Sequence, residues 1–160
     1  MKKIPLFDIA LWTAIVLWCV MIFSLSGENG SASGGRSEKI CRFVAETFIS
    51  DFDEMSLSEQ NKTVDGMQFF VRKTAHFSAY AALGLMLFAA FRKKTKGKAF
   101  CLAVIISAAY ATSDELHQLF VAGRSGRLAD VLLDTCGAAF GGLVALLLIS
   151  AVRKIKAKRR

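Results

Sequence analysis

AFCLAVIISAAYATSDELHQLFV, residues 99–121, decides the fold of this chain because polar side chains end a stretch that can cross a membrane. About 20 predominantly apolar residues span the hydrocarbon core as a helix. Three other stretches, residues 9–25, 66–91 and 131–152, have a similar character. Composition agrees, since 54% of the 160 residues are hydrophobic and only one is proline. We therefore predict an all-α integral membrane four-helix bundle that forms a single domain over residues 1–160.

Basic residues occupy three segments outside these apolar stretches. They precede the first span, separate the second from the third, and follow the fourth: Lys2, Lys3, Arg92, Lys93, Lys94, Lys96, Lys98, Arg153, Lys154, Lys156, Lys158, Arg159 and Arg160. With four spans the three segments share one side, which the positive-inside rule makes cytoplasmic. We expect a multi-pass protein of the cell membrane with both termini cytoplasmic. The net charge of +8 then reflects topology and contact with membrane lipids, and nucleic acid is not an expected partner.

The first apolar stretch has a second interpretation. Its basic start and the small residues Ser24 and Ser26 are also features of a cleavable signal peptide. The run is long for that role and contains Trp12 and Trp18, which favours a retained helix. Both interpretations place residue 27 outside the cell, so the predicted topology is the same.

Residues 27–65 are predicted to lie outside, between the first two spans. Residues 26–37 are rich in Gly and Ser, which indicates a flexible connector. Residues 38–52 have the pattern of an amphipathic helix, which would lie on the membrane interface or cap the bundle, or act as a lid over a site. Its apolar face is expected to consist of Ile40, Phe43, Val44 and Phe48. Ser56 and Glu59 have capping-box spacing, so a further helix starts there and continues into the second span.

Polar side chains gather where the spans reach the outer side. They include His76, Asp114, Glu115, His117, Gln118, Asp130 and Asp134. A charge at membrane depth is expensive, so such residues usually face a protein interior or a water-filled cavity and mark a site. At about 100° per residue, one side of the third helix carries a polar set opposite Ile105, Leu116 and Leu119. This polar set consists of Ser107, Tyr110, Asp114, Glu115 and Gln118.

The neighbouring helices bring further polar groups to the same end. Arg124 and Arg127 lie in the short outer loop, and the start of the fourth span continues into Gly137 and Gly141, a GxxxG pair that permits close helix packing. We predict one ligand-binding site near the outer leaflet. It consists of Arg72, Lys73, His76, Tyr80, Asp114, Glu115, Gln118, Arg124, Arg127, Asp130 and Asp134. His117 is left out because it points away from Gln118, by roughly 100°.

A purely structural interpretation is that these groups form a charge-compensated network that specifies helix register. Their number exceeds what four helices need for register, and the basic members suit phosphate or carboxylate, so we favour a functional site. The four cysteines show no metal-ligand spacing or disulfide framework. No metal and no cofactor is predicted, and no oligomeric state.

The ordered set of motifs resembles the VanZ-like membrane family. The resemblance is carried by Phe23-Ser24-Leu25-Ser26, by Arg72-Lys73-x-x-His76-x-x-x-Tyr80-x-x-Leu83-Gly84, and by Asp114-Glu115-Leu116-His117-Gln118-Leu119-Phe120 with Arg124, Arg127, Asp130 and Asp134-x-x-Gly137. It implies a small multi-helix membrane protein of the bacterial cell envelope. The family is associated with low-level resistance to teicoplanin-type glycopeptides. The resemblance of the chain to this family implies no particular reaction.

Three classes of function remain open for the predicted site. The protein could bind the polar headgroup of an envelope lipid or a lipid-bearing antibiotic, such as a lipid-linked cell-wall precursor or a lipoglycopeptide. It could instead be an enzyme acting on such a molecule, with His76 as acid/base and Asp114 and Glu115 among the carboxylates that hold a cation or a proton. No nucleophile or recognised catalytic motif is present, so binding is favoured. A structural role in membrane assembly is the third class, whereas a channel would need polar groups across the whole membrane.

Overall fold

The computed structural model describes residues 5–28 and 30–158, which are helical throughout apart from turns and loops. The elements are α1 (Leu6–Ser26), α2 (Gly30–Phe48), the short 3-10 helix η1 (Phe52–Glu54), α3 (Leu57–Ala90), α4 (Lys96–Gln118) and α5 (Leu128–Lys158). The described residues contain no strand, so the predicted all-α class is confirmed. The basic residues predicted to flank the spans at positions 2, 3, 159 and 160 lie outside the described residues.

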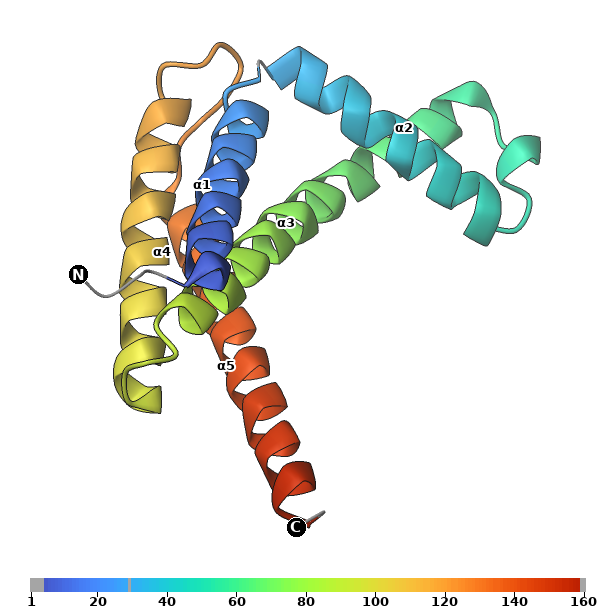
Figure 1. Cartoon of the computed structure of the whole chain (residues 1–160). Coiled ribbons are helices and arrows are strands. Elements are labelled where there is room, and N and C mark those ends of the chain that lie inside the picture. Colours follow the sequence, from blue (N-terminus) through green and yellow to red (C-terminus); the bar gives the residue numbers. More distant parts are fainter. Residues whose placement is uncertain (1–4, 29, 159–160) are drawn as a thin grey trace.

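The bundle is organised around the contact between α3 and α5, which is the most extensive between any two helices described (Figure 1). Small residues on α5 make this contact close. A β-carbon added to Gly137 would overlap the backbone of Phe77, and one added to Gly141 would overlap the backbone of Ala81. The GxxxG pair lies on a close packing face, as predicted, and the helix that it meets is α3. Any larger side chain would force the two helices apart.

Helix α4 packs against α3 and α5 with the side that the sequence predicts. Ala103, Ser107, Ala111, Asp114, Glu115 and Gln118 are buried, whereas Ile105, Leu116 and Leu119 are exposed. Helix α1 is joined to this group by polar contacts as well as apolar ones. The Trp18 indole donates to the Ala79 carbonyl oxygen at 2.9 Å, and the Tyr110 hydroxyl donates to the Cys19 carbonyl oxygen at 2.6 Å.

Three described helices are long and apolar enough to cross a membrane, namely α1, α4 and α5. Most side chains of α1 are exposed, including Phe7, Val16 and Leu17, which an apolar solvent would cover. Residues 66–91 form the larger part of α3 and do not meet the same criterion of length and composition. Their position beside α1, α4 and α5 completes the four-helix bundle, and their crossing of the membrane stays a prediction.

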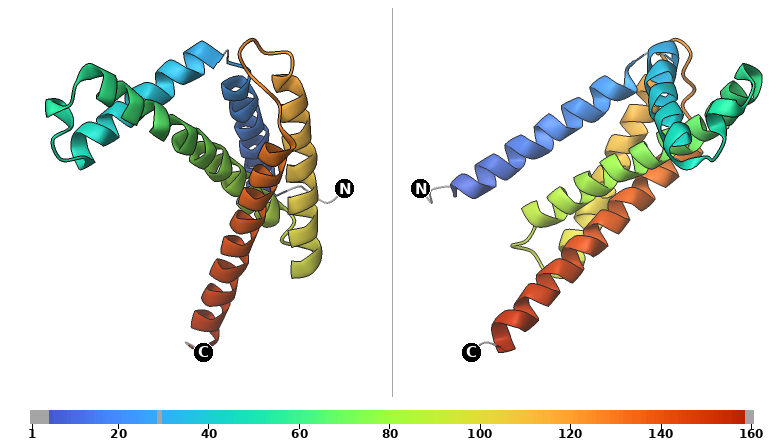
Figure 2. Two further views of the ribbon diagram at one scale, coloured as in Figure 1. Left: turned by 180° about the vertical axis from the view of Figure 1, so that it is seen from behind. Right: turned by 90° about the vertical axis from the view of Figure 1, so that its right-hand side faces the viewer.

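The first part of α3 leaves the bundle and forms an arm together with α2 and η1 (Figure 2). Helix α3 has 34 residues, which corresponds to roughly 50 Å of length. Its start is confirmed as a capping box, because the Ser56 hydroxyl accepts from the Glu59 amide while the Glu59 carboxylate accepts from the Ser56 amide. Helix α3 continues without a break into the bundle, as the sequence predicts.

One expectation for the segment before α3 is wrong. The Gly/Ser-rich connector is largely helical, since α2 begins at Gly30. The Ser37 hydroxyl of α2 lies within hydrogen-bond distance of the Gly34 carbonyl oxygen and of the Gln68 side chain of α3. The buried face of α2 consists of Ser37, Cys41 and Ala45, because small side chains let α2 approach α3 closely. Of the expected apolar face, Phe43 and Phe48 are exposed, Val44 is half-buried, and Ile40 is exposed at the border of the space between α1, α2 and α3.

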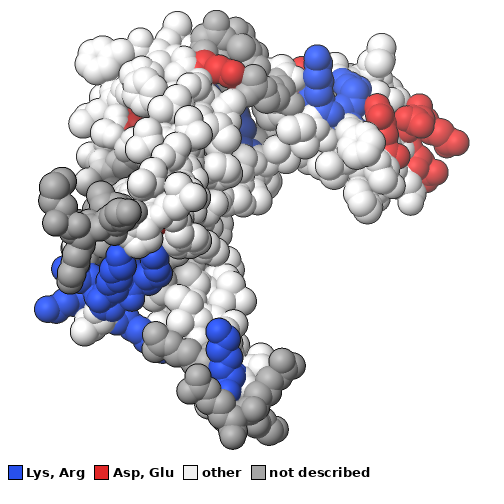
Figure 3. All heavy atoms as spheres, viewed as in Figure 1, with Lys and Arg blue, Asp and Glu red and all other residues white. Residues whose placement is uncertain are grey.

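The opposite end of the bundle carries the basic loop between α3 and α4. Lys and Arg gather over this lower part of the molecule in Figure 3, whereas the acidic residues gather at the tip of the arm. Asp8 at the start of α1 forms ion pairs with Arg92 and Lys93. Asp8 therefore joins α1 to the α3–α4 loop, a contact that the sequence does not indicate.

Candidate functional site

Two adjoining cavities lie at the end of the bundle where α1 ends, α2 begins and the α4–α5 loop turns (Figure 1). We call them the apolar cavity and the polar cavity after their linings. Both open between the helices, and both are lined by residues of α3.

The apolar cavity has a volume of about 170 Å³ and lies between α1, α2 and α3. Its aliphatic lining comes from all three helices: Met21, Ile22, Leu25, Ile40, Val71, Ala75 and Ala79. The phenol ring of Tyr80 closes its inner end, and Tyr80 is fully buried. A cavity with this lining suits a hydrocarbon chain better than a hydrated group.

The polar cavity has a volume of about 200 Å³ and lies between α3, α5 and the α4–α5 loop. Its ionisable and amide lining consists of Arg72, Lys73, His76, Glu115, Gln118, Arg124, Arg127, Asp130 and Asp134. Phe69 and Leu133 are among the few apolar residues that line it. Basic, acidic and amide side chains thus surround one small space.

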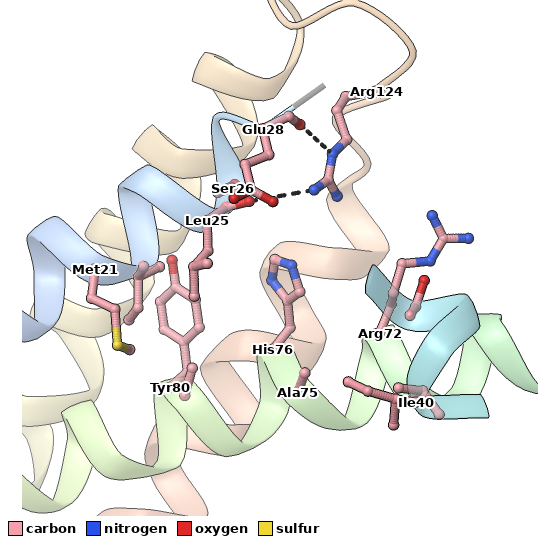
Figure 4. A pocket seen from close by; sticks show the side chains of 14 residues that line it. Met21, Leu25, Ser26, Glu28, Ile40, Arg72, Ala75, His76, Tyr80 and Arg124 are labelled. Atoms are coloured by element: carbon pink, nitrogen blue, oxygen red, sulfur yellow. Dashed lines mark hydrogen bonds between the residues drawn. The ribbon is translucent and has the colours of Figure 1, made fainter. Parts of the chain in front are cut away.

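The two cavities meet at Arg72, His76 and Arg124, which line both. In Figure 4, Tyr80, His76 and Arg72 rise from α3, while Arg124 points toward them from the α4–α5 loop. Arg72 precedes His76 by one helical turn, and Tyr80 follows His76 by another, so the three share a face of α3. A molecule that entered both cavities would pass cationic side chains at the boundary between them.

A buried hydrogen-bond network holds the α4–α5 loop over this site. The Glu115 carboxylate accepts from the Arg127 amide at 2.8 Å and from the Gln118 side chain at 3.2 Å. The Gln118 amide also donates to the Ser26 hydroxyl of α1 at 2.7 Å. Glu115 and Gln118 are buried, so they connect α1, α4 and the loop without solvent competition.

Two of the acidic residues pair with basic residues of α3. Lys73 forms an ion pair with Asp130 at the start of α5. The Nδ1 atom of His76 lies 3.5 Å from an Asp134 carboxylate oxygen, a separation longer than an ordinary hydrogen bond. Asp134 is fully buried, whereas the His76 side chain is about a quarter exposed, at 27%. Asp134 thus lies behind His76 on the protein side of the cavity.

Arg124 is held by backbone oxygens. Its Nε donates to the Glu28 carbonyl oxygen at 3.2 Å, and a terminal nitrogen donates to the Leu25 carbonyl oxygen at 3.5 Å (Figure 4). Burial of the guanidinium lowers the pKa of Arg124, and the nearby Arg72 cation lowers it further. Arg124 nevertheless stays protonated, since a guanidinium keeps its charge in proteins.

Several buried polar groups at the site have no hydrogen-bond partner among the described residues, and of Asp114, Tyr80 and Ser107 only Tyr80 lines a cavity. Asp114 is fully buried, and neither of its carboxylate oxygens completes a hydrogen bond with a described residue, although Ser26 and Gln118 lie beside it. The Tyr80 and Ser107 hydroxyls are also buried without a hydrogen-bond partner among the described residues. Buried polar groups of this kind usually bind water or a ligand group.

The structure therefore brings most of the predicted site residues to one place. Ten of the eleven line one cavity or both: Arg72, Lys73, His76, Tyr80, Glu115, Gln118, Arg124, Arg127, Asp130 and Asp134. Asp114 is the exception and lies behind them. His117 lines neither cavity, as expected, and stacks on Phe23 with ring centroids 4.1 Å apart. The ion pairs at this end join Lys73 to Asp130 and bring His76 beside Asp134.

The apolar lining is the part that the sequence does not indicate. Ile22, Leu25 and Ile40 belong to apolar stretches in which nothing distinguishes a cavity residue from one that faces lipid. The sequence does contain a signal for Ser26. It is a polar residue at the end of an apolar span, and the other buried polar residues of the site have the same kind of position. Among the described residues no group of three His, Cys, Asp or Glu side chains could hold a metal ion, so a cation held by the carboxylates gains no support.

Comparison with known proteins defines the class of this membrane protein. The family model VanZ/LLP1 matches residues 11–149, which include every residue of the site. The chain belongs to the VanZ/LLP1 family. It is thus a VanZ-like envelope protein, and its association with antibiotic resistance follows from the family's name. No curated protein and no solved structure matches the chain.

Proposed function

We propose that this protein binds an amphiphile of the cell envelope, with a hydrocarbon chain in the apolar cavity and an anionic headgroup in the polar cavity. The observation that carries the proposal is that the two cavities share Arg72, His76 and Arg124. Guanidinium groups suit phosphate and carboxylate, and the neighbouring apolar lining suits an acyl or isoprenyl chain. An envelope lipid, a lipid-linked cell-wall precursor and a lipoglycopeptide all have these two parts.

The proposal includes the orientation of the protein. The basic α3–α4 loop and the basic C-terminal segment favour a cytoplasmic location for that end of the bundle, with both termini cytoplasmic. The cavities lie near the opposite end and therefore face the outer leaflet. A site at the outer leaflet fits a ligand of the cell envelope, as the family association with glycopeptide resistance suggests.

The test is native mass spectrometry of the full-length protein purified in a mild detergent. The wild type is expected to retain an amphiphile, and the Ala79→Trp variant to lose it, because an indole would fill the apolar cavity. Phe140→Trp is the matched control, since Phe140 is exposed on α5 and lines neither cavity. Retention that is equal in Ala79→Trp and the wild type would contradict the proposal.

An enzyme is the second candidate, favoured by the pair formed by His76 and Asp134. A buried carboxylate behind an imidazole can orient it as a general acid/base, and His76 faces both cavities. The substrate would be the same class of amphiphile, with Glu115 and Asp114 as neighbouring carboxylates. Release of a headgroup or phosphate from added lipid that stops in His76→Ala would support an enzyme, whereas intact lipid after long incubation with the wild type would refute it.

A further inference from the structure

We infer that the headgroup taken by the polar cavity ends in a terminal phosphate, a phosphomonoester or a diphosphate, held between the guanidinium groups of Arg72, Arg124 and Arg127. The inference rests on the proposed function, because it names the headgroup class of the same site. It also separates this ligand from the phosphodiester lipids that form most of a bacterial membrane.

The positive charge in the polar cavity exceeds what its acidic residues neutralise. Asp130 pairs with Lys73, and Asp134 lies beside His76. Glu115 accepts hydrogen bonds from the Arg127 amide and the Gln118 side chain, so its oxygens are directed at the loop backbone and at α4. Four cationic and three acidic side chains line the cavity, so one positive charge remains when His76 is neutral. The three guanidinium groups form no ion pair with a carboxylate of the lining, as far as the described residues show.

Two of these guanidinium groups are free to bind a ligand. Arg72 and Arg127 are exposed, and neither side chain makes a hydrogen bond or an ion pair with another residue that the structure describes. They project from different elements, α3 and the α4–α5 loop, and both line the polar cavity. Arg124 lies near enough to Arg72 for the two positive charges to repel each other, and the carboxylates of Glu28, Asp114 and Glu115 act in the opposite direction. An anion bound between the two guanidinium groups would relieve the remaining repulsion.

A terminal phosphate matches three guanidinium groups better than a phosphodiester does. It offers three acceptor oxygens and a charge of about −1.5 to −2 at neutral pH. A phosphodiester has one negative charge and two unesterified oxygens, which a single bidentate guanidinium can occupy. The other guanidinium donors that line the cavity would then find no phosphate oxygen to bind.

The test compares two lipids with the same acyl chains, phosphatidic acid and phosphatidylglycerol, by titration into the detergent-purified full chain and native mass spectrometry. We expect phosphatidic acid to bind at least about tenfold more tightly, since one additional charge-assisted hydrogen bond is enough for that ratio. The Arg72→Gln and Arg127→Gln variants are expected to bring the ratio close to one. Arg72→Lys should keep part of the affinity but lose most of the preference, because an ammonium cannot bind two oxygens side by side.

Arg42→Gln is the matched control, because Arg42 is an arginine of α2 that lines neither cavity. Equal affinity for the two lipids overturns the inference and leaves the proposed function in place. Failure of the wild type to bind either lipid overturns both. Inorganic phosphate alone provides the third arm: if it binds as tightly as phosphatidic acid, the terminal phosphate is supported and the need for a hydrocarbon chain is refuted.

Discussion

Glu115 shows at the scale of one residue how this site is built. A carboxylate near the end of α4 would be costly in an apolar bundle, and it is tolerated because it accepts hydrogen bonds from Arg127 and Gln118. Through these bonds it closes the α4–α5 loop and, by way of Gln118, reaches Ser26 of α1. Glu115 is therefore primarily a positioning residue for the arginines of the loop.

Replacing Glu115 with alanine should lower the free energy of unfolding by about 1–3 kcal/mol, because the Arg127 amide and the Gln118 side chain lose their acceptor. Glu115→Gln keeps an acceptor oxygen and should cost less. Thermal unfolding of the detergent-purified protein, followed by circular dichroism, measures both. Equal stability of Glu115→Ala and the wild type would show that the network does not hold the loop.

Helix α2 shows at the scale of an element what a sequence pattern leaves undecided. Its outward face, with Ile40, Phe43 and Phe48, is the apolar stripe that the 3.6-residue periodicity identifies. Its protein-facing side is instead made of Ser37, Cys41 and Ala45. Apolar periodicity identifies a face that avoids water, but it does not distinguish a membrane interface from a helix partner. Small residues at i, i+4 and i+8 are the better indicator of close helix packing.

Close packing of small residues also holds α3 against α5, and a substitution in that contact tests it. Gly141→Ala should destabilise the bundle by about 1–3 kcal/mol, because the added β-carbon overlaps the backbone of Ala81 and the helices must separate. Gly66→Ala is the matched control, because nothing lies within 4 Å of a β-carbon at that position. It should raise stability by about 0.5–1 kcal/mol through helix propensity. Chemical unfolding in detergent measures both, and a neutral Gly141→Ala would contradict the close contact.

At the scale of the whole molecule, the distribution of charge and the position of the cavities both depend on topology. The polar residues could be predicted to meet because alternating spans bring the same ends of three helices together, and helical phase turns them inward. The apolar cavity could not be predicted, since it arises where α1, α2 and α3 fail to fill the space between them. The ion pairs of Asp8 with Arg92 and Lys93 also depend on the folded arrangement.

Cysteine labelling tests the proposed orientation in intact cells. In a variant with its four native cysteines replaced, Ser125→Cys in the α4–α5 loop should react with a membrane-impermeant maleimide. Lys94→Cys in the α3–α4 loop should react only after lysis, because the positive-inside rule places that loop in the cytoplasm. The reverse pattern of labelling would place the cavities on the cytoplasmic side and exclude an outer-leaflet ligand.

Binding of an amphiphile across the two cavities is tested most directly by photo-crosslinking. The probe is a phosphatidic acid that carries a diazirine on its acyl chain, and mass spectrometry identifies the labelled peptides. If the acyl chain occupies the apolar cavity, adducts form on cavity residues such as Ile22 and Ala79. These adducts should disappear in the double variant Arg72→Gln, Arg124→Gln. Adducts on Phe140 and Leu147 should persist in both proteins, because these exposed side chains of α5 meet bulk lipid wherever the headgroup lies. Adducts confined to such outward residues, or cavity adducts that are unchanged in the double variant, would contradict binding of the amphiphile in the two cavities.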